Sequence, residues 1–164
     1  MERRCFPVFI DLTDKKILVA GGGSIALRRI RTLLAFGADI HVVAPKLCGG
    51  LRCLEEEGKV KAERREYRAG DIQEAQMVLA ATDDRSVNRK IWNDCKAAGV
   101  MVNVADDKEL CDFYFPSVVL AENTVIGINS GGYDPSVTKN MRQKIEKMCG
   151  DREESLYDRG NTGE

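Results

Sequence analysis

Hydrophobic residues along this chain fall into short apolar runs that alternate with stretches of helical spacing. The runs typical of strands buried on both faces of a sheet are 16–20, 39–44, 76–81 and 100–104. Residues 59–65 alternate between polar and apolar positions, as an edge strand does. Apolar residues recur at helical spacing in 24–36, 47–57 and 84–98. This order, with right-handed crossovers, predicts an α/β fold with a Rossmann-like, doubly wound parallel sheet.

The rhythm changes after residue 115. Two β-like runs, separated by Glu122-Asn123, predict a β-hairpin over 117–121 and 124–129. A turn at Ser130-Gly131-Gly132 then leads into a helix expected over 135–148. A hairpin and one helix are too small to bury a core alone. We therefore expect this segment to pack on the sheet or on a second copy of itself, and to build a homodimer.

Composition fits one α/β domain with a modest appendage. The chain has 164 residues, of which 43% are hydrophobic and 31% charged, as in ordinary globular proteins. We expect a Rossmann domain over 1–115, a dimerisation segment over 116–149, and a frayed polar tail over 150–164.

Charge and cysteine usage narrow the class of protein. Lys and Arg number 25 against 26 Asp and Glu, so the basic excess typical of a nucleic-acid binder is missing. No run approaches the roughly 18 apolar residues of a membrane span, and no apolar segment follows the basic start as in a signal peptide. The six cysteines form no C-x-x-C pair and there is one histidine, which argues against a zinc site. Reduced thiols in the cytoplasm are the favoured interpretation.

A glycine motif lies directly between the first strand and the first helix. Gly21, Gly22 and Gly23, followed by Ser24, Ile25 and Ala26, fit G-x-G-x-x-A. Such a turn brings the backbone close to a pyrophosphate, whose charge lies at the helix N-terminus. The alternative is a glycine turn kept for packing alone. The acid expected about 20 residues later to bind the ribose is missing, because the second strand ends in Ala44-Pro45-Lys46. Because this acid is missing, the motif does not indicate whether the cofactor is NAD or NADP.

Polar residues follow two later strands, where ligands bind in open α/β sheets. Thr82 and Asp84 follow the strand at 76–81, and Asp84 is better explained as the N-cap of the next helix. Asp106 and Asp107 follow the strand at 100–104 and can supply a general base or a metal-binding carboxylate. A loop with a solvated pair of acids is the alternative for these two.

Three other features are weaker candidates for chemistry. His41 lies inside a strand and is better explained as a packed residue than as a catalyst. Cys111 can face the same cleft, although nothing marks it as activated. The Ser130-Gly131-Gly132 turn is a possible anion nest, with Lys139 and Arg142 one to two turns further along the helix.

Taken together, the motifs resemble the precorrin-2 dehydrogenase / sirohydrochlorin ferrochelatase family, the N-terminal module of siroheme synthases. The resemblance runs from about residue 6 to 148. The motifs that carry it are Phe6-Pro7-Val8-Phe9-Ile10-Asp11-Leu12, Val19 to Arg28, Val42-Val43-Ala44-Pro45, Ala80-Ala81-Thr82-Asp83-Asp84, Asn88, Val102-Asn103-Val104-Ala105-Asp106-Asp107, Phe115-Pro116-Ser117 and Ser130-Gly131-Gly132. The missing ribose acid is usual in that family.

The resemblance implies NAD-dependent oxidation of precorrin-2 to sirohydrochlorin on the way to siroheme. By matching of motifs, Asp106 is the catalytic acid, and it is also the residue implicated in iron insertion. The matching places Ser24, Ile25, Pro45, Lys46, Thr82, Asp83 and Val104 at the NAD site, with the three glycines. On the substrate side it gives Asn103, Ser130 and Gly131. Since the substrate carries eight carboxylates, Arg28, Lys139 and Arg142 are further candidates for binding it.

Alternatives remain open at this stage. Many relatives continue into a further helical segment, whereas few and mostly polar residues follow Met148 here, which leaves iron insertion in doubt. The competing hypotheses are a single-function dehydrogenase, an enzyme that also inserts Fe²⁺, and a non-catalytic sensor of NAD or tetrapyrrole.

Overall fold

The computed structural model describes residues 5–131 and 134–149, which form two compact units. One unit spans Asp11–Phe113, and the other combines 5–10 with the described residues from 114 onward. Residues 5–10 therefore cluster with the C-terminal unit, whereas we had expected them to belong with the sheet. Gly132 and the expected tail at 150–164 lie outside the described residues. The division into three domains stays a prediction.

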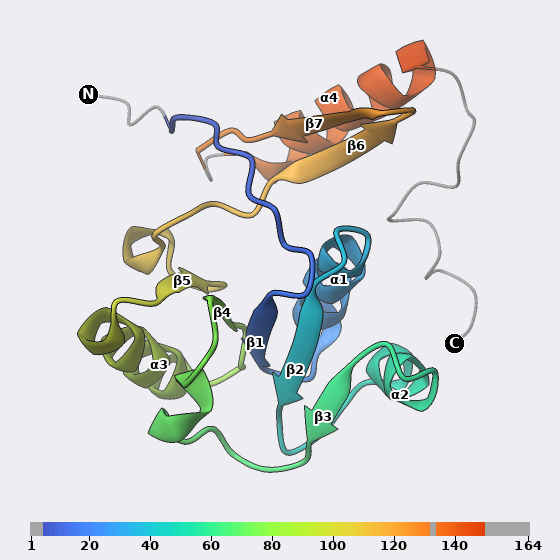
Figure 1. Ribbon diagram of the computed structural model, residues 1–164. Coiled ribbons are helices and arrows are strands. Elements are labelled where there is room, and N and C mark those ends of the chain that lie inside the picture. The colour runs from blue at the N-terminus through green and yellow to red at the C-terminus, as the bar shows by residue number, and fades with distance from the viewer. Residues whose placement is uncertain (1–4, 132–133, 150–164) are drawn as a thin grey trace. The chain divides into compact units, whose positions relative to one another are not determined.

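A five-stranded parallel sheet forms the centre of the Asp11–Phe113 unit, in the order β3-β2-β1-β4-β5 (Figure 1). Its strands are β1 (Lys16–Ala20), β2 (Asp39–Val43), β3 (Lys61–Glu63), β4 (Met77–Ala80) and β5 (Met101–Val104). β1 and β4 are almost completely buried, because helices cover both of their faces. The predicted Rossmann-like fold is confirmed.

The helices α1 (Ser24–Leu34), α2 (Gly49–Glu56) and α3 (Arg85–Ala98) pack on the sheet (Figure 1). Ile91 and Cys95 of α3 join a core cluster with alternate residues of β1, β4 and β5. The intervening strand residues, such as Ile17 and Leu79, are fully buried on the opposite face of the sheet. The alternation places α1 and α3 on opposite faces, as a doubly wound sheet requires.

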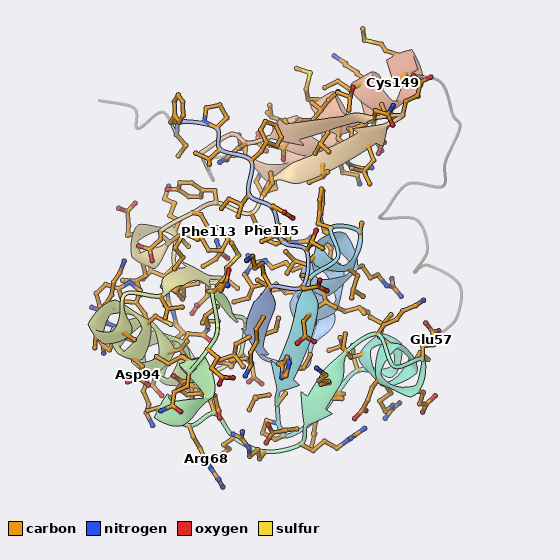
Figure 2. All side chains as sticks on the ribbon, viewed as in Figure 1. Glu57, Arg68, Asp94, Phe113, Phe115 and Cys149 are labelled. Carbon is orange, nitrogen blue, oxygen red and sulfur yellow. The ribbon has the colours of Figure 1, made fainter. Side chains whose placement is uncertain are left out.

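The sheet is less well covered beside β2 and β3. The connection from β3 to β4 contains only a 3₁₀ turn, Ala69–Ile72, instead of a helix. Tyr67, at the start of this connection, donates a hydrogen bond to Asp94 of α3 over 2.9 Å. Figure 2 labels Asp94 on this helix. A polar cavity of about 320 Å³ opens on this part of the sheet, and residues lining it include Lys16, His41, Lys61, Glu63, Asp71 and Glu74. The strand residues His41, Lys61 and Glu63 beside this cavity are polar, whereas Val42 and Val43 of β2 are buried, so this part of the sheet is only partly covered.

The C-terminal unit contains the antiparallel hairpin β6 (Ser117–Ala121) and β7 (Thr124–Ile128), followed by α4 (Pro135–Cys149). The two-residue turn is at Glu122-Asn123, as predicted, and Glu122 adopts a φ of 51°. α4 packs mainly against β6. Among the described residues, no helix is both long enough and apolar enough to span a lipid bilayer.

Candidate active site at the carboxyl edge of the sheet

The glycine motif makes a close turn at the carboxyl end of β1. Gly21 has a φ of 131°, and a Cβ there would lie 2.2 Å from the carbonyl oxygen of Ala81. A Cβ at Gly22 would lie 1.9 Å from the carbonyl oxygen of Lys46. The Gly22 carbonyl also accepts a 2.8 Å hydrogen bond from the Cys48 amide. The glycines therefore let the loops after β1, β2 and β4 meet.

The third glycine differs from the first two, because a Cβ at Gly23 would have no atom within 4 Å. Gly23 is the N-cap of α1, and the helix start has neither a side-chain cap nor an acid in its first turn. Ser24 and Ile25 of that turn are exposed. Open space before an uncapped helix N-terminus fits the pyrophosphate of a dinucleotide, because the first amides of a helix attract anions.

The other expected cofactor residues border the same turn. Pro45 and Lys46 follow β2 and are exposed, and Thr82 and Asp83 follow β4. Val104, the last residue of β5, is buried with 3% of its surface exposed. The structure thus brings four of the predicted cofactor segments to one edge of the sheet. The contacts of these residues with a cofactor stay predictions.

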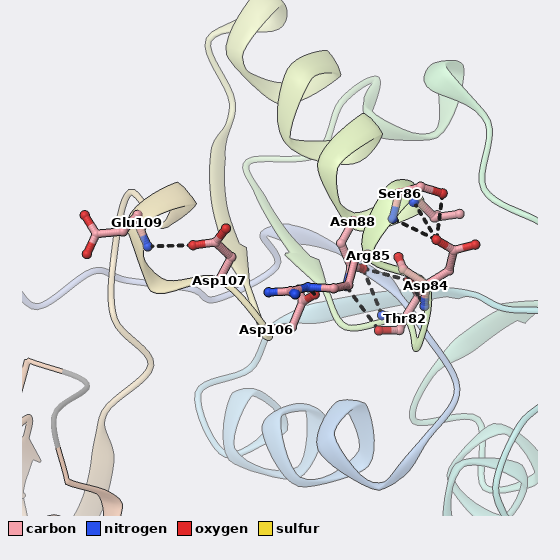
Figure 3. Close-up of polar contacts among 9 residues, drawn as sticks. Thr82, Asp84, Arg85, Ser86, Asn88, Asp106, Asp107 and Glu109 are labelled. Carbon is pink, nitrogen blue, oxygen red and sulfur yellow. Dashed lines mark hydrogen bonds and ion pairs between the residues drawn. The ribbon is translucent and has the colours of Figure 1, made fainter.

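Asp106 lies just beyond β5 and contacts two residues of α3 (Figure 3). The side-chain amide of Asn88 donates to its Oδ1 over 2.9 Å, and Nε of Arg85 donates to its Oδ2 over 3.2 Å. The Asp106 side chain is 31% exposed and that of Arg85 is 80% exposed. The carboxylate is therefore held on one side by a buried amide and on the other by a solvated cation.

Asp106 also lines a pocket of about 250 Å³. The pocket lies between the end of β5 and the first turns of α3, and its lining residues are Arg85, Asn88, Arg89, Val104, Asp106, Asp107 and Leu110. Asp107 is engaged in local structure, because its Oδ1 accepts the amide of Glu109 in the 3₁₀ turn Lys108–Leu110. The Asp106 carboxylate can accept a proton, and the guanidinium groups of Arg85 and Arg89 beside it can bind an anionic substrate.

Asn103 and Cys111 interact with each other behind this loop. Asn103 is 3% exposed, and its amide donates to the Phe113 carbonyl over 2.7 Å and to the Cys111 sulfur over 3.5 Å. The Cys111 thiol lies 3.2 Å from both the amide nitrogen and the carbonyl oxygen of Val104. Burial raises the pKa of Cys111, so this cysteine is not activated as a nucleophile.

Asp84 has the structural role that the sequence predicted for it, and His41 lies inside a strand, as predicted. Asp84 is the N-cap of α3, since its carboxylate accepts from the amides of Ser86 and Val87, and this prediction is confirmed. The hydrogen bonds from Ser86 lower the pKa of Asp84. His41 is part of β2 and pairs with Asp39 over 3.0 Å on the polar face of the sheet.

The substrate residues predicted in the C-terminal unit are described within that unit only. The Ser130 hydroxyl donates to the Asp134 carbonyl, and the Gly131 amide donates to the Asn129 side chain over 2.7 Å. Lys139 is exposed on α4, whereas Arg142 is 8% exposed and pairs with Glu146. Substrate contact by Arg142 therefore requires it to leave this pair. Arg28, the remaining candidate, is exposed on α1 in the sheet unit.

The contacts of α3 with Asp106 were not predicted from the sequence. Asn88 belongs to the family motifs without a predicted role, and Arg85 and Arg89 are not among the predicted site residues. One signal was present, because Asn88 lies on the apolar stripe of its helix, three and seven residues before the buried Ile91 and Cys95. A polar residue on such a stripe indicates a buried hydrogen-bond partner.

Comparison with known proteins identifies the family of the chain. The family model described as "Putative NAD(P)-binding" matches residues 8–117. The chain is 42% identical to a "probable multifunctional siroheme biosynthesis protein" of Ruminiclostridium josui, over 87% of this chain and 28% of that protein. It is 38% identical to the siroheme synthase of Actinobacillus pleuropneumoniae serotype 3, over 87% of this chain and 29% of that protein. The chain thus spans less than a third of the length of these curated relatives.

A solved structure adds the fold-level comparison. The precorrin-2 dehydrogenase SirC superposes with a TM-score of 0.73 at 29% identity, over 88% of this chain and 71% of that one. These matches confirm the resemblance that the sequence motifs indicated. The match over residues 8–117 covers the glycine turn and the Asp106 loop. The chain therefore belongs to the NAD(P)-binding family that this model defines, and it is a relative of siroheme synthases and of SirC.

Proposed function

We propose that this protein is an NAD-dependent dehydrogenase that oxidises precorrin-2 to sirohydrochlorin in siroheme biosynthesis. The observation that carries the proposal is the position of Asp106, which lies in a pocket at the carboxyl edge of the sheet, one strand away from the Thr82 loop. The similarity to SirC and to siroheme synthases supplies the substrate.

The reaction removes two electrons and two hydrogens from the tetrapyrrole. A bound NAD⁺ would supply the acceptor for one hydrogen and both electrons, as a hydride. Asp106 accepts the other hydrogen as a proton and later releases it to solvent, to which 31% of its side chain is exposed. The glycine turn and the N-terminus of α1 hold the pyrophosphate, and Ser24, Ile25, Pro45, Lys46, Thr82, Asp83 and Val104 line the remainder of the cofactor site.

Recognition of the substrate depends on cations and polar groups, because precorrin-2 carries many carboxylates. We assign this role to Arg28, Asn103, Ser130, Gly131, Lys139 and Arg142. Arg85 and Arg89 add two guanidinium groups at the Asp106 pocket itself. A guanidinium binds a carboxylate in a bidentate geometry, which favours an acidic substrate over a neutral one.

We further propose that the active form is a cytoplasmic homodimer. Val137, Met141 and Met148 of α4 are exposed apolar residues spaced by four and seven positions, so they share one face of the helix. A second copy of the chain would bury this face. All six cysteines are free thiols, which favours a reducing compartment.

An anaerobic assay with precorrin-2 and NAD⁺ tests the function. We expect NADH and the sirohydrochlorin spectrum to arise together in equal amounts. Protein that binds NAD⁺ but forms no NADH would overturn the proposal and favour a sensor. After this reaction is complete, addition of Fe²⁺ tests for chelatase activity. Such activity would appear as loss of sirohydrochlorin at a rate above that of spontaneous iron insertion.

A further inference from the structure

Asn88 joins the two loops that the proposed reaction uses. It lies in the first turn of α3 with 1% of its surface exposed. Its amide nitrogen donates to Asp106 Oδ1 over 2.9 Å and to the Thr82 carbonyl over 3.1 Å. Its Oδ1 accepts the Thr82 amide over 3.1 Å and lies 2.8 Å from the Thr82 hydroxyl. One buried side chain thus contacts both the cofactor-lining loop and the acid (Figure 3).

The direction of these hydrogen bonds is fixed by the backbone of Thr82. A backbone N–H can only donate, so the atom of Asn88 that faces it must be the oxygen. Rotation of the amide by half a turn would set its NH₂ group against this N–H and its oxygen against both the Thr82 carbonyl and the carboxylate of Asp106. Asn88 therefore donates to Oδ1 of Asp106, which can accept this bond whether Oδ2 is ionised or protonated.

We propose that Asn88 is a positioning residue that holds the Asp106 carboxylate at a fixed distance from the cofactor loop. This proposal rests on the proposed function, because it assigns Asp106 the proton transfer. The amide fixes Oδ1 of Asp106 and leaves Oδ2 on the side of Arg85. The carboxylate is therefore held in one orientation, with Oδ2 as the atom that accepts the proton.

Arg85 is the other residue in contact with Asp106, but it is less suited to this role. Its side chain is 80% exposed and makes one 3.2 Å hydrogen bond to the carboxylate. Exposed ion pairs of this kind contribute little, because solvent screens them and a long side chain must be ordered. Asn88 is buried and held from both sides, so it restricts the position of Asp106 more strongly.

The test compares Asn88→Asp with Asn93→Asp in the full chain. Asn88→Asp keeps the shape and the oxygen that accepts from the amide and hydroxyl of Thr82, but it replaces the donor shared by Asp106 and the Thr82 carbonyl with a carboxylate oxygen. Asn93 is exposed on the same helix, so Asn93→Asp makes the same chemical change away from the site. We expect kcat of Asn88→Asp to fall about 10- to 100-fold with the KM for NAD⁺ nearly unchanged, and Asn93→Asp to behave as the wild type.

The pH profile separates positioning from a general loss of structure. Two adjacent carboxylates disfavour a doubly charged state, so the acidic limb of the kcat profile should move to higher pH in Asn88→Asp. The other charged groups around the pocket are Arg85, Arg89 and Asp107, and all three are unchanged in the variant. A wild-type kcat and pH profile in Asn88→Asp would overturn the proposal even if the dehydrogenase activity is real.

A measurement without turnover keeps the proposal separate from the proposed function. Hydrogen exchange of peptides covering 81–83 and 104–107 should be faster in Asn88→Ala than in the wild type, while the strands β1 and β4 stay protected. Unchanged exchange in both peptides would overturn the positioning role. If Asn88→Ala does not fold, the same comparison is made with Asn88→Asp, for which faster exchange is expected at 104–107 only.

Discussion

The carbonyl oxygen of Lys46 occupies the space that a side chain at Gly22 would need, 1.9 Å from an ideal Cβ. Gly22→Ala therefore forces the loops after β1 and β2 apart, and we expect a loss of about 1–3 kcal/mol in the free energy of unfolding. Urea denaturation followed by circular dichroism measures this loss.

Gly23→Ala is the matched substitution with the smaller expected loss. A Cβ there meets no protein atom within 4 Å and the φ of −91° suits alanine, so the expected loss of stability is only the weaker N-cap preference of alanine, about 0.5–1 kcal/mol. The added methyl stands where the pyrophosphate approaches the start of α1, and we expect weaker binding of NAD⁺ in a calorimetric titration. Wild-type affinity in Gly23→Ala would show that the cofactor does not bind at this turn.

Asp106→Asn is expected to abolish most turnover. The amide has nearly the shape of the carboxylate but cannot accept the proton, so kcat should fall about 10²- to 10⁴-fold while NAD⁺ binding is kept. Steady-state assays and a binding titration measure the two quantities. Asp107→Asn is the neighbouring control, and its effect should be small because Asp107 bonds to the amide of Glu109. Equal losses in both variants would contradict the assignment of Asp106.

The ion pair between Arg65 and Asp71 should make stability depend on pH. Burial tends to raise the pKa of Asp71, but the two 2.8 Å hydrogen bonds from Arg65 and one from the Arg68 amide outweigh it, so the pKa is lowered. A lowered carboxylate pKa stabilises the fold above the unfolded value of about 3.9 and loses this effect as the pH falls through the folded value.

Asp71→Asn should therefore be less stable than the wild type by about 1.5–3 kcal/mol at pH 7. The difference in unfolding free energy should shrink as the pH is lowered below about 4. Urea titrations at pH 7 and pH 3 check this, and a constant difference would mean that the pair does not depend on the charge of Asp71. Activity at pH 7 should be unaffected, because Asp71 lies beside β3, away from the Asp106 pocket.

Because we propose that the exposed apolar face of α4 forms the dimer interface, we expect a charged substitution on this face to separate the dimer. Met141 is 45% exposed in the single chain, and Met141→Glu places a charge on the face that we propose to be covered. Light scattering should give twice the 18.2 kDa chain mass for the wild type and the single mass for this variant. Gln143→Glu, an exposed change about half a helical turn away, should stay dimeric. A monomeric wild type contradicts the proposal.

Most of the fold could be predicted because the relevant signals are local. β1 and β6 have the predicted bounds, since a buried run ending at a glycine turn or a hairpin turn defines its own limits. α2 begins at Gly49 instead of the expected residue 47, because the amide of Cys48 bonds to the Gly22 carbonyl. β3 is shorter than 59–65, because the chain turns at Arg65, whose amide bonds to the Glu63 carbonyl.

The site was predictable only as far as motifs identify single residues. The glycine turn and the Asp84 cap follow from residue type and position next to strands, whereas Asp106 was singled out by the family resemblance. The contacts of Asn88 with Thr82 and Asp106 span six and 18 residues of sequence, and they depend on how α3 approaches β4 and β5. No local sequence pattern predicts how α3 packs against these strands, so the contact between Asn88 and Asp106 could not be predicted from the sequence.

The uneven covering of the sheet also implies an uneven lifetime of its backbone hydrogen bonds. β1 and β4 are buried on both faces, whereas β3 is short and largely exposed beside the polar cavity. Local opening costs least where few apolar contacts must be broken. The edge at β3 should therefore open and close many times for each opening of the central strands, so the glycine turn after β1 and the Thr82 loop after β4 are anchored to the slowest part of the sheet.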